Sequence, residues 1–212
     1  MRNRLWLPCA SAGVILAITA STGLLAEGFS NAKVVVTKSA IVPGKSEALA
    51  VQHPSVVVYF DGQSEETILA NGSRHREEIT RGKTVREPAE TGTLLNTGST
   101  PLVFVRVEFL TAGGQETWGT TGLAPSYKVL FEDQHSRTYD IRIPAHAREP
   151  QHTHHDRVVI CLSGATLEHI LPDGRKQPST LKTGEIAWRQ GQTHIGHNMG
   201  NTDLWVIAIE PK

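Results

Sequence analysis

The sequence has few cysteines and no excess of charge of either sign. Its two cysteines, Cys9 and Cys161, are too few for a disulfide framework. Lysine and arginine together number 21, as do aspartate and glutamate, so the formal net charge is zero. Nucleic-acid-binding proteins normally carry a basic excess or a basic stripe, and this chain has neither. The composition therefore predicts no nucleic-acid partner.

Motifs of several common catalytic classes are also missing. The chain has no nucleophile elbow, no phosphate-binding glycine loop, no paired-carboxylate spacing and no long helical pattern. Hydrophobic residues at 39% and charged residues at 20% are nonetheless typical of a folded domain. Histidine stands out, because eight of the ten histidines occur from His135 onward.

The first 26 residues predict a secretory signal peptide. Two arginines precede an apolar run that ends at Ala26, and charge returns at Glu27. An uncleaved membrane anchor is the alternative, but Pro8 and Gly13 interrupt the run. Cleavage after Ala26 or near Ala20 would leave a periplasmic or secreted protein with no membrane partner. The mature chain would keep only Cys161, which we expect in the core.

The remaining sequence contains a repeat at an offset of 102 residues. Residues 53–62 match residues 155–164 without a gap, from a histidine through an apolar run to a glycine. The same offset pairs glycines and polar residues further along: Gly72 with Gly174, Gly82 with Gly184, Asn96 with Asn198, and Glu108 with Glu210. Glycines that match over this length without a gap predict two copies of one domain.

Each copy consists of short apolar runs, such as 56–60 and 158–162, separated by turn signals about ten residues apart. This spacing predicts an all-β barrel or sandwich. Residues 111–126 are rich in glycine, threonine and proline and are expected to be a linker. The predicted organisation is a first barrel at 27–110, the linker, and a second barrel at 127–212.

Three histidines of the second copy form a candidate metal site. His152 and His154 are two residues apart in a strand that we expect to continue to residue 162, so both point to the same face. His194 is the best candidate for a third ligand from a neighbouring strand. Imidazole suits zinc, iron, nickel and copper, so the pattern predicts one bound divalent transition metal.

The two histidine segments resemble the paired motifs of the cupin superfamily. The first motif runs from His152-x-His154 to Gly164, and the second runs from Gly184 through His194 to Asn198. The resemblance implies a bicupin, that is, two tandem double-stranded β-helix (jelly-roll) barrels, with the metal between the two motifs of a barrel. It also implies a small-molecule substrate or ligand and pairing into a homodimer.

The sequence departs from the cupin pattern at two positions. The family's glutamate ligand would fall near Arg157 or Val158, and Gln190 stands where proline is usual. The segment after His154 also looks one residue short. The three histidines that remain resemble the cupins that use Fe(II) to activate oxygen, while zinc, nickel or manganese would suit other chemistry. Asp156 and His197 are candidate replacement ligands.

The first copy lacks these histidines. The offset places Ala50, Gln52 and Gly92 opposite His152, His154 and His194, so we expect no metal in the first barrel. The paired residues His53 and His155, and Asn96 and Asn198, occur in both copies. Because one of those copies has no metal site, we expect these pairs to have structural roles.

Arg157 and Arg189 flank the predicted site and are candidates for binding a carboxylate or phosphate of the substrate. The interpretation favoured by the sequence is a surface charge on the outer strand face. His169 is expected to be an ordinary surface or loop residue. The predicted function is an Fe(II)-dependent oxygenase. The alternatives are a zinc, nickel or manganese lyase, isomerase or hydrolase, and a non-catalytic binding protein for a small ligand or metal.

Overall fold

The computed structural model describes residues 27–212 and consists of 18 strands connected by loops and turns. The all-β prediction is therefore confirmed. The predicted signal peptide, residues 1–26, lies outside the described residues. Within the described part of the chain, no helix has the length and apolar character needed to span a membrane.

The strands divide into two sets of nine. The first set is β1 (Glu27–Ser30), β2 (Val34–Ile41), β3 (Ser46–Val51), β4 (Ser55–Tyr59), β5 (Gln63–Leu69), β6 (Arg74–Ile79), β7 (Thr84–Glu87), β8 (Glu90–Asn96) and β9 (Leu102–Phe109). The second set is β10 (Tyr127–Glu132), β11 (Ser136–Ile143), β12 (Arg148–His154), β13 (Arg157–Ser163), β14 (Ala165–Ile170), β15 (Lys176–Leu181), β16 (Ile186–Arg189), β17 (Gln192–Asn198) and β18 (Leu204–Pro211).

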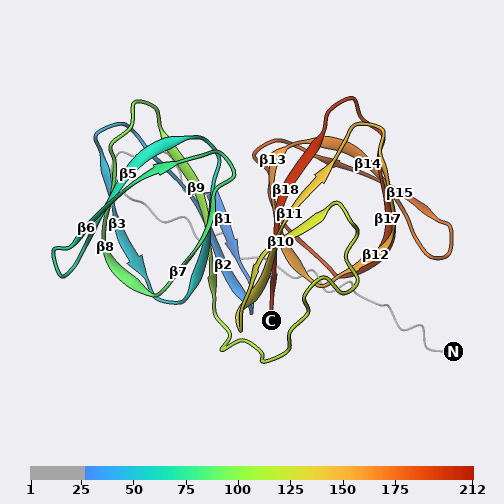
Figure 1. Ribbon diagram of the computed structural model, residues 1–212, viewed down its shortest axis with the longest axis horizontal. Helices are drawn as coiled ribbons and strands as arrows, with labels where there is room; N and C mark the ends of the chain where they lie inside the picture. Colours follow the sequence, from blue (N-terminus) through green and yellow to red (C-terminus); the bar gives the residue numbers. More distant parts are fainter. Residues whose placement is uncertain (1–26) are drawn as a thin grey trace, which may run out of the picture.

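Each set forms one barrel from a five-stranded and a four-stranded sheet (Figure 1). The first barrel has the strand orders β1-β2-β9-β4-β7 and β3-β8-β5-β6. The second has β10-β11-β18-β13-β16 and β12-β17-β14-β15, which is the same topology moved by nine strands. The structure thus reproduces the repeat seen in the sequence.

The two barrels share one hydrophobic core where their five-stranded sheets face each other in the middle of the molecule (Figure 1). This cluster combines side chains from both sets of strands, among them Val56, Val107, Ile160 and Ile207. The alternate residues of the same strands point into the barrels, which each have a separate apolar cluster. Because both faces of these sheets are buried, their strands read as continuous apolar runs.

The asparagine repeat has the structural role expected from the sequence. Asn96 donates from Nδ2 to the carbonyls of Ile41 and Thr100, at 2.7 and 2.8 Å. Asn198 donates in the same way to Ile143 and Thr202, at 3.0 and 2.8 Å. Each side chain ties the end of one strand to a loop, so the residue is needed whether or not the barrel holds a metal.

Truncation in the shared core should destabilise both barrels together. Ile160→Ala removes a fully buried side chain from that core and should cost about 2–5 kcal/mol of unfolding free energy. Val42→Ala, at a position that is 43% exposed, should cost less than about 0.5 kcal/mol.

The measurement is urea unfolding followed by two signals. Tryptophan fluorescence reports the second barrel and the shared core, because Trp118 lies in the connection and Trp188 and Trp205 pack against that core, whereas far-ultraviolet circular dichroism reports the strands of both barrels. The two transitions of Ile160→Ala should coincide at a lower midpoint. Separate transitions would contradict a shared cooperative core.

Candidate metal centre

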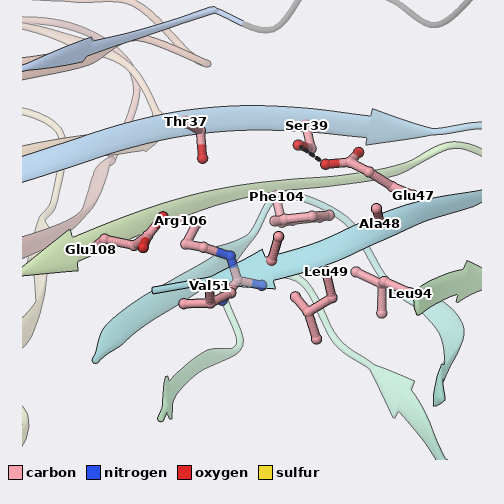
Figure 2. A pocket seen from close by; sticks show the side chains of 11 residues that line it. Thr37, Ser39, Glu47, Ala48, Leu49, Val51, Leu94, Phe104, Arg106 and Glu108 are labelled. Carbon is pink, nitrogen blue, oxygen red and sulfur yellow. Dashed lines mark hydrogen bonds between the residues drawn. The ribbon is translucent and has the colours of Figure 1, made fainter. Parts of the chain in front are cut away.

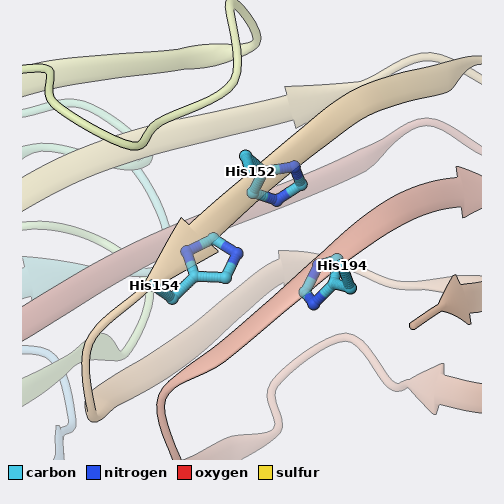
Figure 3. A group of neighbouring side chains, drawn as sticks. All are labelled: His152, His154 and His194. Atoms are coloured by element: carbon cyan, nitrogen blue, oxygen red, sulfur yellow. The ribbon is translucent and has the colours of Figure 1, made fainter. Parts of the chain in front are cut away.

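The three predicted histidines come together inside the second barrel (Figure 3). His152 and His154 lie on β12, and His194 lies on the adjacent β17, where it is directly opposite His152 in the antiparallel pair. Their ligand atoms all lie within 4.8 Å of one another, and each side chain is at most 4% exposed. The expectation that a neighbouring strand supplies the third histidine is therefore confirmed.

The strand that carries the first two histidines is shorter than expected. The sequence predicted one strand through residue 162, but β12 ends at His154 and β13 begins at Arg157 in the other sheet of the barrel. The chain therefore turns from one sheet to the other directly after the second histidine. Within β12, the pairing with β17 shifts between Arg148 and Gln151, which is a β-bulge.

Hydrogen bonds and burial prepare the histidines to bind a cation. His152 Nδ1 lies 2.9 Å from the Pro150 carbonyl, which only accepts, so Nδ1 carries the proton and Nε2 keeps its lone pair. His194 Nδ1 lies 3.2 Å from Gln192 Oε1, which sets the same tautomer. Burial lowers the pKa of all three imidazoles, for His194 to about 3. Neutral imidazole is the form that binds metals.

The second nitrogen of His154 supports the same conclusion. His154 Nδ1 is buried without a hydrogen-bond partner, and Nε2 contacts only the hydroxyl of Tyr127, at 3.1 Å. Unpaired buried nitrogens of this kind are costly unless a ligand or ion satisfies them. Three neutral nitrogen donors at this spacing fit one divalent transition metal.

Two residues that the sequence did not predict complete the surroundings of the cluster. The Tyr127 hydroxyl also lies 3.1 Å from His152 Nε2, and burial raises the pKa of this phenol, so it stays a donor. The His169 ring stacks on His194 at 4.3 Å between centroids. The prediction of a surface role for His169 is wrong, because alternation along β14 places it on the same inner face as Leu167. That alternation is a signal the sequence did contain.

Glu149 is a third residue of the site that sequence reasoning missed. Its Oε2 lies 3.8 Å from His152 Nε2, its other oxygen accepts a hydrogen bond from Ser126, and burial raises the pKa of the carboxyl to about 7. Residues three apart in a regular strand face opposite sides, and the bulge in β12 brings Glu149 and His152 to the same side. No simple alternation rule could have found it.

The structure does not bring the two candidate replacement ligands to the cluster. Asp156 lies in the turn after β12, where Oδ1 accepts a hydrogen bond from the Gly191 amide at 2.7 Å. His197 is on β17, but the inner face of that strand carries His194, Gly196 and Asn198. An odd number of residues from His194, His197 faces the other side of the sheet.

The two arginines beside the site have different surroundings. Arg157 is only 8% exposed and lies on the face of β13 that points into the barrel, so its interpretation as a surface charge is wrong. Arg189 lies directly opposite it on β16, and its guanidinium pairs with Glu185 at 2.9 Å. The side chain of Arg189 is 42% exposed.

Solved structures with the same architecture identify the fold. AerE from Microcystis aeruginosa superposes with a TM-score of 0.67 at 15% identity, over 94% of this chain and 98% of that chain. A cupin 2 conserved barrel domain protein from Leptotrichia buccalis gives 0.57 at 14% identity, over 97% and 100%. The chain has the cupin fold. An oxalate decarboxylase of Bacillus subtilis, described with Mn(II) centres, gives 0.55 at 12% identity, over 84% and 68%.

These cupin relationships are structural, since no family model and no curated protein sequence matches the chain. At identities this low, the similarity establishes the fold and leaves the chemistry to the residues of the site.

The first cupin barrel has apolar residues where the second has the first two histidines. Leu49 pairs with Gly92, and Val51 pairs with Glu90, so Leu49 and Val51 are the spatial counterparts of His152 and His154. The sequence offset had assigned Ala50 and Gln52. That assignment is wrong, because the bulge adds one residue to β12 and the shorter connection to β13 removes one. The segment after His154 is indeed one residue shorter than its counterpart in the first barrel, in the connection between the two strands.

A cavity of about 160 Å³ opens in the first cupin barrel, lined by Leu49, Val51, Phe104, Arg106 and Glu108 among others (Figure 2). The Arg106 guanidinium pairs with Glu87 and donates to Ser55 Oγ at 3.1 Å. The buried guanidinium of this barrel is therefore neutralised by a carboxylate. The only metal-ligand cluster within residues 27–212 lies in the other barrel.

The side chain of Glu149 occupies the space that a side chain at position 196 would need, so replacing Gly196 should destabilise the protein. A Cβ at position 196 would overlap Glu149 Oε2, so Gly196→Ala should cost about 1–3 kcal/mol of unfolding free energy. The cost should fall clearly in a Glu149→Ala background and persist in a Glu149→Gln background, where the side chain keeps its size. Urea unfolding of the six proteins, which form two double-mutant cycles, measures the coupling. Equal costs in all backgrounds would refute the contact.

The raised pKa of Glu65 in the first barrel should make the stability of the protein depend on pH. This carboxyl accepts a hydrogen bond from Tyr59 at 2.9 Å, its other oxygen is unpartnered, and burial raises its pKa from 4.5 to about 7. The folded state therefore keeps a proton that the unfolded state loses, and stability falls as the pH rises from 4.5 to about 7.

The variant Glu65→Gln should remove this dependence. Its stability relative to the wild type should rise across that pH interval by an amount on the order of 3 kcal/mol. Urea unfolding at several pH values measures the difference. Parallel stability profiles for the two proteins would show that Glu65 is not held protonated by the fold.

Proposed function

We propose that this chain is an exported bicupin whose second barrel holds one divalent transition metal and whose first barrel holds none. The observation that carries the proposal is the buried cluster of His152, His154 and His194. The apolar counterparts Leu49 and Val51 in the first barrel support its degenerate character. Export is supported by the basic and apolar pattern of residues 1–26.

The activity that we propose is oxidation of a small organic molecule by molecular oxygen, of the dioxygenase type, with Fe(II) as the favoured ion. His152, His154 and His194 would hold the ion as neutral ligands and leave it its full charge, and the ion would supply oxygen activation as Fe(II) or Lewis acidity as another metal. All three residues of the cluster are histidines, and none is a carboxylate. This composition supports a similarity to metal sites that are built from three histidines.

Residues of the chain around the cluster would orient the substrate and handle protons. The Tyr127 hydroxyl is a neutral donor placed between His152 Nε2 and His154 Nε2. Glu149 has a carboxyl whose pKa is raised to about 7 by burial, so near neutral pH it can release or accept a proton at Oε2. The apolar interior formed by residues such as Ile141 and Leu167 excludes water from the reaction.

A second candidate is Lewis-acid chemistry with manganese, zinc or nickel, in a lyase, isomerase or hydrolase. Two observations favour it: the buried acid–base group Glu149 beside the cluster, and the Mn(II) centres of the oxalate decarboxylase that shares the fold. The two candidates differ in whether oxygen is consumed, so one set of measurements separates them.

Metal content should depend on the cluster and not on the first barrel. We expect close to one equivalent of metal per chain in the purified protein. His152→Ala and His194→Ala should lose most of it, at least about tenfold in affinity, because two imidazoles hold a divalent ion poorly. Gln52→Ala, just after β3 in the first barrel, is the control and should keep full occupancy. Elemental analysis after defined metal loading measures all four proteins.

The identity of the metal and the consumption of oxygen then decide the activity. Bound iron with substrate-dependent oxygen uptake supports the oxygenase, and zinc or manganese turnover without oxygen uptake supports the second candidate. Failure of the wild type to bind any divalent metal, or loss of metal in Gln52→Ala, would refute the proposed site.

A further inference from the structure

Arg157 is a buried positive charge without a counter-ion among residues 27–212. Its only hydrogen bonds in this range run from Nη1 to the carbonyls of His155 and Gln190, both at 3.4 Å, and Nε is buried without a partner. The guanidinium stays charged at all physiological pH values. Burying such a group without a paired anion is destabilising, so this arrangement calls for a ligand.

The buried carboxylates of the second barrel are already engaged elsewhere. Glu210 receives hydrogen bonds from Arg137 and Tyr139, and Glu149 receives one from Ser126. The partly exposed Glu185 pairs with Arg189. None of these residues forms an ion pair with Arg157, so the described chain does not satisfy its charge from within.

The first barrel shows how this position is neutralised when no ligand is needed. There, Ser55, Glu87 and Arg106 form one cluster in which the guanidinium pairs with the carboxylate. The corresponding positions in the second barrel hold Arg157, Arg189 and Ala208, in the same strand register. In the barrel that carries the histidine cluster, these positions therefore hold no ion pair: Arg189 pairs outside the set with Glu185, and Arg157 has no counter-ion.

The positive charge of Arg157 also affects the pKa values of the imidazoles in the histidine cluster. Burial is the main cause of the lowered pKa of His152, His154, His194 and His169, and the positive charge of Arg157 contributes to the lowering in all four. A bound divalent metal would add further positive charge to the same interior. An anion is the ligand that such an interior favours.

We propose that Arg157 binds the carboxylate of a small organic acid whose other end reaches the three-histidine cluster. The planar donors of a guanidinium match the two oxygens of a carboxylate, and the unpaired Nε of Arg157 is one such donor. The part of this inference that places one end of the ligand at the histidine cluster rests on the proposed function. The part that places its carboxylate at Arg157 rests on the surroundings of that residue alone.

Thermal unfolding of the full mature chain, metal-loaded and metal-free, tests the proposal with acetate as the probe. Acetamide is the neutral probe of the same shape, and inorganic phosphate is the alternative anion. Acetate should raise the melting temperature of the wild type saturably, while acetamide should not. Arg157→Met should weaken acetate binding at least about tenfold. Without ligand, Arg157→Met should melt about 2–4 °C higher, because an uncompensated buried charge is gone.

A second pair of variants does not require removal of Arg157. Arg189→Glu places a carboxylate opposite Arg157, as Glu87 lies opposite Ser55 in the first barrel, and should also weaken acetate binding at least about tenfold. Arg189→Gln removes the same charge without supplying an anion and should retain binding, as should Arg175→Gln at an exposed hairpin position.

The outcomes separate this inference from the proposed function. Arg157-dependent acetate binding in a protein that takes up no metal would refute the metal site and support the anion site. Metal binding without saturable acetate binding, or equal acetate binding by wild type and Arg157→Met, would overturn the inference alone. Tighter binding of phosphate than of acetate would overturn the assignment to a carboxylate.

Discussion

Burial of both faces of the two five-stranded sheets is the constraint on which the rest of this molecule depends. One face of each sheet packs against the other barrel, through residues such as Val107 and Ile207, and the opposite face lines a barrel interior. Apolar burial of this extent is the main source of stability in a β-protein. Because the shared core provides that stability, the four-stranded sheet of the second barrel can carry buried polar side chains and an irregular strand pairing. The bulge in β12 and the histidine cluster both occur there.

The two barrels show how one scaffold becomes a site in one copy and remains a scaffold in the other. The strand orders are the same, and Asn96 and Asn198 make equivalent hydrogen bonds. Apart from the bulge in β12 and the shorter connection after it, the differences that form the site lie at inward positions of a few strands. Apolar side chains stand in place of the histidines on β3, and the ion pair between Glu87 on β7 and Arg106 on β9 has no counterpart beside the unpaired Arg157. A barrel interior can accept this exchange because its polar groups must be satisfied, either by each other or by a ligand.

A single inserted residue accounts for much of the chemistry of the second barrel. The bulge turns Glu149 to the same side as His152, and Gly196 provides the space for its carboxylate. The bulge also moves the histidines one residue away from the positions that the repeat would assign. Bulges are common next to functional sites because they redirect side chains without changing the sheet around them.

The sequence by itself determined the all-β class, the repeat at 102 residues, the structural asparagines and the three histidines, because strand alternation, turn residues and internal self-similarity are local signals. Only the tertiary structure decided which polar residues join those histidines. Tyr127 approaches from a strand of the other sheet, Glu149 turns inward at a bulge, and Arg157 follows a change of sheet that the apolar run conceals. Each of these depends on contacts between segments far apart in the chain, and local periodicity carries no information about such contacts.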